Sequence, residues 1–238
     1  MKKLFLFFLA VAVLASCSKD ESNPNQNGGD CKLTEWKSYY DEGDGFYDGG
    51  TKKIYYDNQN RVSKVETFYR GKLEITTTFS FSDKQIVANS IRGKSVYFLN
   101  GNNLIESYTE NGYKSTITYT SSNQLSTIAD NGQTTVFEYS DGNLTSAKNS
   151  LKNTPYSRTW KLTYDKSKNF SPMGTFGLSP FYEIFGDTEY DSSHILYDQG
   201  YFGTKIKNAV ITLVDGDFTR NYTYSYSNGN ISSYGNQD

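Results

Sequence analysis

Aromatic and large apolar residues alternate with short polar stretches along most of the chain. Seven aromatic residues are each followed, five or six positions later, by a large apolar residue: Tyr56 and Val62, Phe81 and Ile86, Phe98 and Leu104, Tyr119 and Leu125, Tyr139 and Leu144, Tyr164 and Phe170, Tyr226 and Ile231. The residues between them are mostly Asp, Asn, Ser, Gly, Gln and Lys, which are favoured in turns. The pattern predicts successive β-hairpins whose aromatic and apolar residues face each other across the strands.

The strands that lead into these turns alternate with period two. Trp160, Leu162 and Tyr164 share one face, with Lys161 and Thr163 on the other. The short spacing between hairpins leaves room only for an antiparallel meander. The mean hydropathy of -0.66 and the polar second face lack the continuous apolar band of a membrane barrel. We therefore expect an all-β, water-soluble barrel or strongly curved sheet.

One segment, residues 170–208, interrupts the hairpin pattern. It contains two prolines and a high density of aromatic residues. A loop of this length is usually functional or disordered, and its large apolar groups argue against disorder. Because a large barrel encloses more space than its own side chains fill, we expect this insertion to plug or cap the interior. Tyr201 and Phe202 would lie beside the plug.

The N-terminus is typical of an exported protein. Lys2 and Lys3 precede an apolar run that ends in Leu14-Ala15-Ser16-Cys17. These four residues resemble the lipobox of bacterial lipoproteins, and the resemblance implies cleavage before Cys17 and its acylation. An ordinary secretory signal with an incidental cysteine is the alternative. The next residues, 18–21 (SKDE), are similar to the signal that sends Bacteroidetes lipoproteins to the outer face of the outer membrane.

Three regions follow from this pattern: a signal peptide at 1–16, a lipidated Cys17 with a flexible polar tether at 17–30, and a single all-β domain at 31–238. Cys31 has no second cysteine to pair with if Cys17 is acylated, so it is either a half-buried apolar residue or a reactive thiol. The net charge is -2, and the basic residues are scattered along the sequence. We therefore expect no nucleic-acid partner and no membrane contact except through the lipid anchor.

The repeats resemble known sequences. Residues 139–144 (YSDGNL) and 55–62 (YYDNQNRV) are similar to the YD repeats of Rhs-type shell proteins. Together with the lipobox, the tether and residues 200–205 (GYFGTK), they resemble a family of Bacteroidetes surface lipoproteins of unknown function with a porin-like β fold. The resemblance implies architecture and location, and it supplies no catalytic residues.

Candidates for catalysis and metal binding are few. His194 is the only histidine, so multi-histidine metal sites are excluded and a lone structural or exposed histidine is expected. Asp187, Glu189 and Asp191 are the nearest approach to a carboxylate pair for glycan hydrolysis. The acidic residues at 41–48 lack the spacing of an EF-hand and suit a polar turn. We predict no catalytic residue, no metal site and no cofactor.

Binding is the function that the composition favours. Aromatic residues make up 16% of the chain, and those left over after cross-strand packing are Trp36, Tyr201 and Phe202. Exposed rings serve in sugar and protein recognition. We expect a cell-surface, outer-membrane lipoprotein that binds a glycan or an envelope protein. The alternatives are a purely structural envelope component and a carboxylate-dependent glycan hydrolase.

Overall fold

The computed structural model of the chain describes residues 9–16, 32–41, 46–110, 112–169, 192–227 and 230–237. Within these ranges the fold is all-β, as predicted, with one short helix, α2 (Ser192–Asp198). The first strands are β1 (Leu9–Ser16), β2 (Lys32–Asp41), β3 (Phe46–Tyr56), β4 (Val62–Tyr69), β5 (Lys72–Phe81), β6 (Gln85–Ser90), β7 (Gly93–Leu99) and β8 (Ile105–Glu110). The later strands are β9 (Tyr113–Tyr119), β10 (Leu125–Ala129), β11 (Gln133–Ser140), β12 (Asn143–Leu151), β13 (Ser157–Asn169), β14 (Asn208–Asp215), β15 (Phe218–Ser227) and β16 (Asn230–Gln237).

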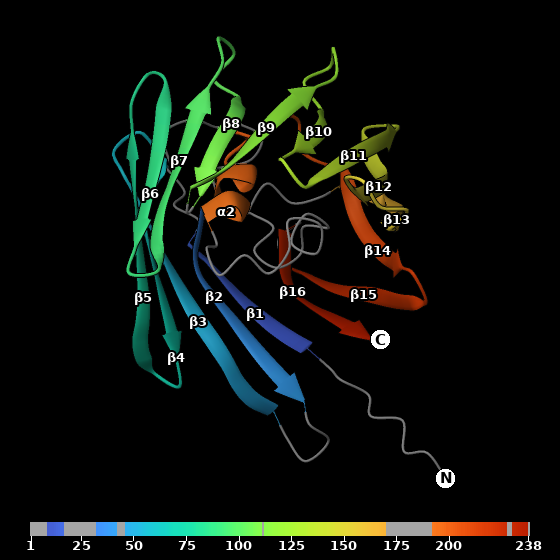
Figure 1. Ribbon diagram of the computed structural model, residues 1–238. Coiled ribbons are helices and arrows are strands. Elements are labelled where there is room, and N and C mark those ends of the chain that lie inside the picture. The colour runs from blue at the N-terminus through green and yellow to red at the C-terminus, as the bar shows by residue number, and fades with distance from the viewer. Residues whose placement is uncertain are drawn as a thin grey trace, which may run out of the picture.

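The strands form an antiparallel meander. Each strand from β2 to β16 pairs with its neighbours in the sequence, and the sheet curves strongly round α2 (Figure 1). β1 lies between β2 and β16 and closes the sheet into a barrel. Without β1, the remaining strands form an open curved sheet with β2 and β16 as its edges. The prediction of a porin-like barrel or strongly curved sheet is confirmed.

The cross-strand pairs that define the hairpins are mostly those predicted. The register pairs Tyr56 with Val62, Phe81 with Ile86, Tyr119 with Leu125, Tyr139 with Leu144, and Tyr226 with Ile231. Four of the apolar partners, those paired with Tyr56, Phe81, Tyr119 and Tyr139, are at most 3% exposed. The aromatic and apolar residues of these four hairpins therefore pack on the inner face.

Two predicted pairs are wrong. Leu99, not Phe98, faces the partner strand at the β7–β8 turn, where it pairs with Ile105, and Phe98 is 39% exposed on the outer face. Its neighbour Tyr97 points inward, so period-two alternation forces Phe98 outward. No hairpin follows Tyr164, because β13 continues to Asn169 and Tyr164 pairs with Val210 of the distant β14.

The turn residues explain why the chain reverses where it does. Asp141 and Gly142 both have positive φ values, 52° and 80°, as a two-residue type I′ hairpin requires. Asn60, Asn103 and Asn123 have φ values of 58–63° near the end of longer loops. Asn tolerates this left-handed conformation better than most residues. The polar residues of the repeat therefore set the reversals.

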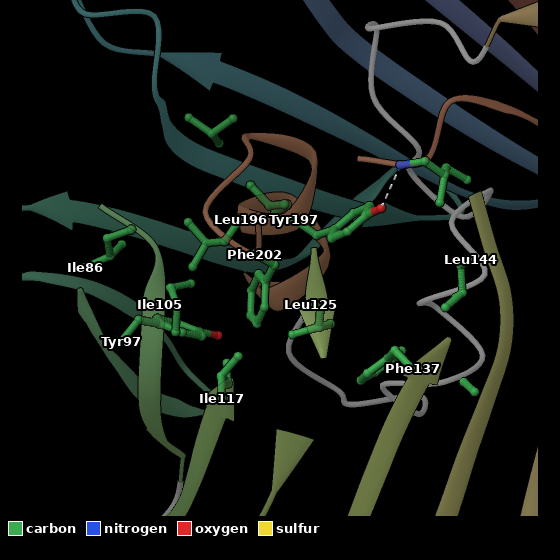
Figure 2. Close-up of a cluster of buried hydrophobic side chains, with 14 of the residues drawn as sticks. Ile86, Tyr97, Ile105, Ile117, Leu125, Phe137, Leu144, Leu196, Tyr197 and Phe202 are labelled. Carbon is green, nitrogen blue, oxygen red and sulfur yellow. Dashed lines mark hydrogen bonds between the residues drawn. The ribbon is translucent and has the colours of Figure 1, made fainter. Parts of the chain in front are cut away.

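The core lies inside the curved sheet and includes part of the insertion. Inward residues of the sheet pack against Leu196, Tyr197 and Phe202, all at most 1% exposed (Figure 2). The Tyr97 hydroxyl lies 2.7 Å from the Ser192 Oγ at the start of α2. As predicted for the insertion, its described part fills the interior, whereas residues 170–191 lie outside the described residues.

The segment after α2, residues 199–208, runs across one end of the barrel, and we call it the cap. Backbone atoms at four turns form hydrogen bonds with the cap. The contacts are Val62 N to Gln199 Oε1 (3.0 Å), Ile105 N to Tyr201 O (2.9 Å), Thr204 N to Asn123 O (2.8 Å) and Lys207 N to Gly142 O (3.2 Å). All four turns connect an odd-numbered strand to the next even-numbered strand. The cap therefore covers the rim where those turns lie.

Candidate functional site

Large apolar side chains are exposed mainly at the rim opposite the cap. Of the large hydrophobic residues that are exposed in the described parts of the chain, seven lie at turns from an even-numbered to an odd-numbered strand. These are Tyr69, Leu73, Ile91, Tyr113, Leu151, Tyr156 and Phe218. We call these turns the distal rim. The exposed fractions reach 82% for Ile91, 80% for Tyr113 and 76% for Phe218.

The remaining exposed apolar residues do not form a second cluster. Tyr55, Phe98, Val136 and Ile211 lie within strands, on the outer face. The described turns beneath the cap consist almost entirely of Asp, Asn, Ser, Gly, Gln, Lys and Arg. The two rims therefore differ in chemistry: one is polar and capped, and the other presents separate apolar side chains to solvent.

Cations accompany the apolar side chains of the distal rim. The sequence around the β4–β5 turn is Tyr-Arg-Gly-Lys-Leu at 69–73, and the β6–β7 turn is Ile-Arg-Gly-Lys at 91–94. The β8–β9, β12–β13 and β14–β15 turns repeat the combination, with Lys114, Lys152, Arg158 and Arg220, whereas the β10–β11 turn has neither a cation nor an exposed large apolar residue. Every one of these cations except Arg220 is exposed. Eight of the 24 Lys and Arg residues of the chain lie at these turns, together with the acidic residues Asp130, Asp215 and Asp217.

Several of these cations are held in place. The Arg70 guanidinium lies 5.2 Å from the centre of the Tyr69 ring. Arg158 Nε donates to Asp215 Oδ1 at 2.8 Å, and its guanidinium lies 4.9 Å from the Trp160 ring. Planar guanidinium groups that are already oriented lose less conformational entropy when they bind a carboxylate or sulfate. Because Arg158 already pairs with Asp215, an anionic ligand that binds Arg158 would share the guanidinium with the Asp215 carboxylate.

An acidic group lies on the inner face near the same rim. Glu110 ends β8 and pairs with Ser95 and Tyr113 across the strands. Burial raises the pKa of Glu110 above its ordinary value, and a hydrogen bond from Ser95 Oγ to Oε1 (3.3 Å) opposes that shift. Burial also raises the pKa of the neighbouring Tyr108. Within the described residues, the side chain that hydrogen-bonds to the Glu110 carboxyl is Ser95 and not a second acid.

The N-terminal end of β2, the first described strand after Cys17, lies at the capped rim. β2 begins at Lys32, and the Tyr56 hydroxyl donates to the Leu33 carbonyl at 2.8 Å. Tyr56 immediately precedes a turn whose next strand begins with Val62, which donates to the cap. The start of β2 therefore lies beside the cap, and the distal rim is the end of the domain farthest from the attachment of the tether.

The three binding residues predicted from the sequence do not lie on the distal rim. The prediction that Phe202 is an exposed ring is wrong, because its side chain is fully buried inside the barrel. Tyr201 is half-buried, with its ring centre 5.9 Å from that of Phe81. Trp36 is partly buried against the core and pairs with Lys52, whose Nζ lies 5.3 Å from the ring centre. Each of these rings is part of the packing.

Other candidate residues lie in the interior or outside the described ranges. His194 is buried in α2 and is not exposed. Asp187, Glu189, Asp191, Cys17 and Cys31 lie outside the described residues. Among the residues that the structure describes, no three His, Cys, Asp or Glu side chains are grouped closely enough to hold a metal ion.

Sequence reasoning missed the distal rim, although a signal was present. An apolar residue stands next to, or one residue from, a Lys or Arg at the ends of alternate hairpins, as in residues 69–73 and 91–94. In a meander, alternate turns lie at the same end of the sheet. Sorting the turns into those that follow odd-numbered strands and those that follow even-numbered strands would have placed these apolar residues and their neighbouring cations at one end of the sheet.

Comparisons with known proteins agree with the fold. A crystal structure of a porin-like protein from Bacteroides uniformis is similar, with a TM-score of 0.54 and 13% sequence identity over 98% of this chain and 94% of that chain. A comparison with curated protein sequences found no match. In the described parts of the chain, no helix has the length and apolar character needed to cross a membrane.

Two family models match the sequence itself. Residues 1–18 match the prokaryotic membrane lipoprotein lipid attachment site, so the protein is a membrane-anchored lipoprotein. Residues 50–232, which include the hairpins, the cap and the described distal rim, match a domain of unknown function with a porin-like fold. The chain therefore belongs to the DUF4595 family of porin-like domains.

Proposed function

We propose that the protein is a non-catalytic binding module, held on the outer face of the outer membrane by its lipid anchor, and that its distal rim binds acidic glycans. The observation that carries the proposal is the repeated combination of an exposed apolar or aromatic side chain with a cation in the turns of one rim. The Lys-acidic sequence at 18–21 supports the location.

The two kinds of side chain suit two parts of an acidic sugar. Tyrosine rings such as Tyr113 present a flat apolar face with a polar edge, which suits stacking on a sugar ring. Lysine and arginine side chains pair with the carboxylate, sulfate or phosphate groups that an acidic glycan carries. The exposed apolar and aromatic residues are spread over separate turns. A flat protein interface would instead be expected to have a packed central cluster.

The orientation of the domain is consistent with this function. The tether enters at the capped rim, so the distal rim is free to point away from the membrane surface. The cap closes the other end through hydrogen bonds to backbone atoms at four turns. A rigid scaffold that holds separate loops at one end is a common arrangement for a binding site.

The test is binding of the mature lipoprotein, in detergent micelles, to an array of neutral and acidic glycans. We expect binding to glycans that carry carboxylate or sulfate groups, with affinity that falls as salt concentration rises. Absence of binding to every acidic glycan would contradict the proposal. Release of shortened products from a bound glycan would contradict its non-catalytic part.

A matched pair of variants locates the binding surface. Tyr113→Ser with Lys114→Ser removes a ring and a cation from the distal rim and should weaken binding about tenfold. The control is Tyr55→Ser with Lys64→Ser, which removes a ring and a cation 4.0 Å apart on the outer face, away from the rim. Equal weakening by the two double variants would show that the distal rim is not the binding surface.

A further inference from the structure

The strand that closes the barrel belongs to the part of the chain that lipid attachment removes. β1 comprises residues 9–16, and the lipid attachment site places the acylated cysteine at Cys17. Cleavage before Cys17 therefore takes away the whole of β1. The mature protein keeps the other strands of the sheet, with β2 and β16 as its two edges.

Removal of β1 leaves a gap between β2 and β16. The pairing of β1 with these two neighbours shows what the gap can accommodate. β1 pairs with β2 along its full length, from Leu9 opposite Tyr40 to Ser16 opposite Lys32. It pairs with β16 only at Val11 opposite Tyr234 and Ala12 opposite Ser233. The gap therefore holds one extended strand of eight residues, which pairs along its length with β2.

The two edges cannot simply pair with each other in the way that the rest of the sheet does. β1 runs antiparallel to both β2 and β16, so β2 and β16 run parallel to one another. Direct closure would place a parallel pair in a sheet whose described pairs are all antiparallel. A parallel pair is slightly less stable per residue than an antiparallel pair. An open edge also leaves backbone N–H and C=O groups without partners.

The inner face of β2 indicates the chemistry of a strand that would fit. Leu33 and Ser38 are buried, and Trp36 packs partly buried against the core. The Trp36 Nε1 is buried and has no hydrogen-bond partner within the described part of the chain. On the outer face, Glu35 and Lys37 form an ion pair at 2.8 Å. A strand with apolar inward residues and a hydroxyl or amide opposite the indole would complete this surface.

We propose that the gap between β2 and β16 in the mature lipoprotein is a binding site for an extended, apolar segment of a second polypeptide, which adds as a strand antiparallel to β2. The tether of this chain is a poor occupant because residues 18–30 carry Pro24, two glycines and no large apolar residue. This strand addition would be independent of glycan binding at the distal rim.

Hydrogen–deuterium exchange read by mass spectrometry tests the proposal on the mature lipoprotein in detergent micelles. Of the amides of residues 33–40, those that point toward β1 should exchange about 100-fold faster in the mature protein than in a Cys17→Ala precursor, which cannot be processed and keeps β1. The alternate amides stay bonded to β3 and should exchange equally in the two proteins. Amides of β11 and β12, far from the gap, should exchange equally in the two proteins. If the precursor does not fold, the mature protein with and without peptide is compared alone.

A synthetic peptide with residues 9–16 between lysine ends is the probe for an incoming strand. It should slow exchange of the β1-facing amides of residues 33–40 about 100-fold at saturation, whereas the same peptide with Val11→Pro and Val13→Pro should have no effect. Amides that are already protected in the mature protein without peptide would show direct closure or edge pairing between two copies, and would overturn the proposal. Fast exchange that the peptide does not slow would also overturn it.

Discussion

Replacing Gly203 with alanine should detach the cap from the turn between β9 and β10. Gly203 has a φ of +92°, and an added Cβ would lie 2.1 Å from the Asn123 carbonyl oxygen and 3.1 Å from Tyr119 Cε1. The first of these distances is far inside van der Waals contact, and the clashing atom belongs to the backbone. The same carbonyl accepts the hydrogen bond from Thr204 N at 2.8 Å. The clash therefore falls on a contact that holds the cap.

Two costs add together in this variant. The left-handed backbone conformation costs alanine about 1–2 kcal/mol relative to glycine. Separation of the Asn123 carbonyl from Thr204 N costs about 1 kcal/mol more, or up to about 2 kcal/mol if the groups stay buried. We therefore expect Gly203→Ala to lower the free energy of unfolding by about 2–4 kcal/mol.

Gly200→Ala is the matched control. Gly200 lies in the same segment with a φ of +85°, but an added Cβ meets no atom within 4 Å. It should cost only the conformational part, about 1–2 kcal/mol. Urea unfolding followed by tryptophan fluorescence gives both free energies. Equal destabilisation by the two substitutions would refute the conclusion that the cap is held by close approach to the β9–β10 turn.

Three further predictions concern the core, the cap and the rim. Phe202→Ala should lower the free energy of unfolding by about 3–5 kcal/mol, whereas Ile91→Ala at the distal rim should change it by less than about 0.5 kcal/mol, both measured by urea unfolding. Asn143→Ala should lower the free energy of unfolding by at least about 2 kcal/mol, measured by thermal and urea unfolding. The reason is that the buried Asn143 Oδ1 accepts from Asn208 N at 2.9 Å and its Nδ2 donates to Asn208 Oδ1 at 3.0 Å. An unchanged stability would show that the Asn pair does not hold the cap. The raised pKa of Glu110 favours its neutral form in the folded state, so its contribution to stability is full below pH about 4.3 and is lost as the pH rises through the folded-state pKa. Glu110→Gln should flatten this part of the pH–stability curve, and an identical curve for the two proteins would contradict the burial of the carboxyl.

The hairpins could be predicted because turn chemistry is local. The Asp141-Gly142 turn places Tyr139 opposite Leu144, so this pair could be predicted from the neighbouring residues alone. Phe98 was placed on the wrong face because Leu99, its smaller neighbour, is the residue in phase with Tyr97. Phe98 and Leu104 are six positions apart, and so are Leu99 and Ile105. Only the register of the whole strand shows which of the two pairs faces the core.

The cap and the distal rim depend on contacts that spacing along the chain does not reveal. The cap joins residues 199–208 to turns up to 139 residues earlier in the sequence, for example through the hydrogen bond from Gln199 Nε2 to Asn60 O. Nothing in the local sequence of Phe202 distinguishes a ring that enters the barrel from one that faces solvent. The exposure of Tyr113 follows from its place at the start of β9, on the rim that the cap leaves open.

Hydroxyl-radical footprinting of the mature lipoprotein, with and without the acidic oligosaccharide that binds most tightly on the array, tests the proposed function most directly. We expect Tyr113, Tyr156 and Phe218 to react in the free protein and to be protected in the complex, with Tyr197 and Phe202 unreactive in both. Protection confined to the capped rim, or reactivity at the distal rim that the bound oligosaccharide leaves unchanged, would contradict it.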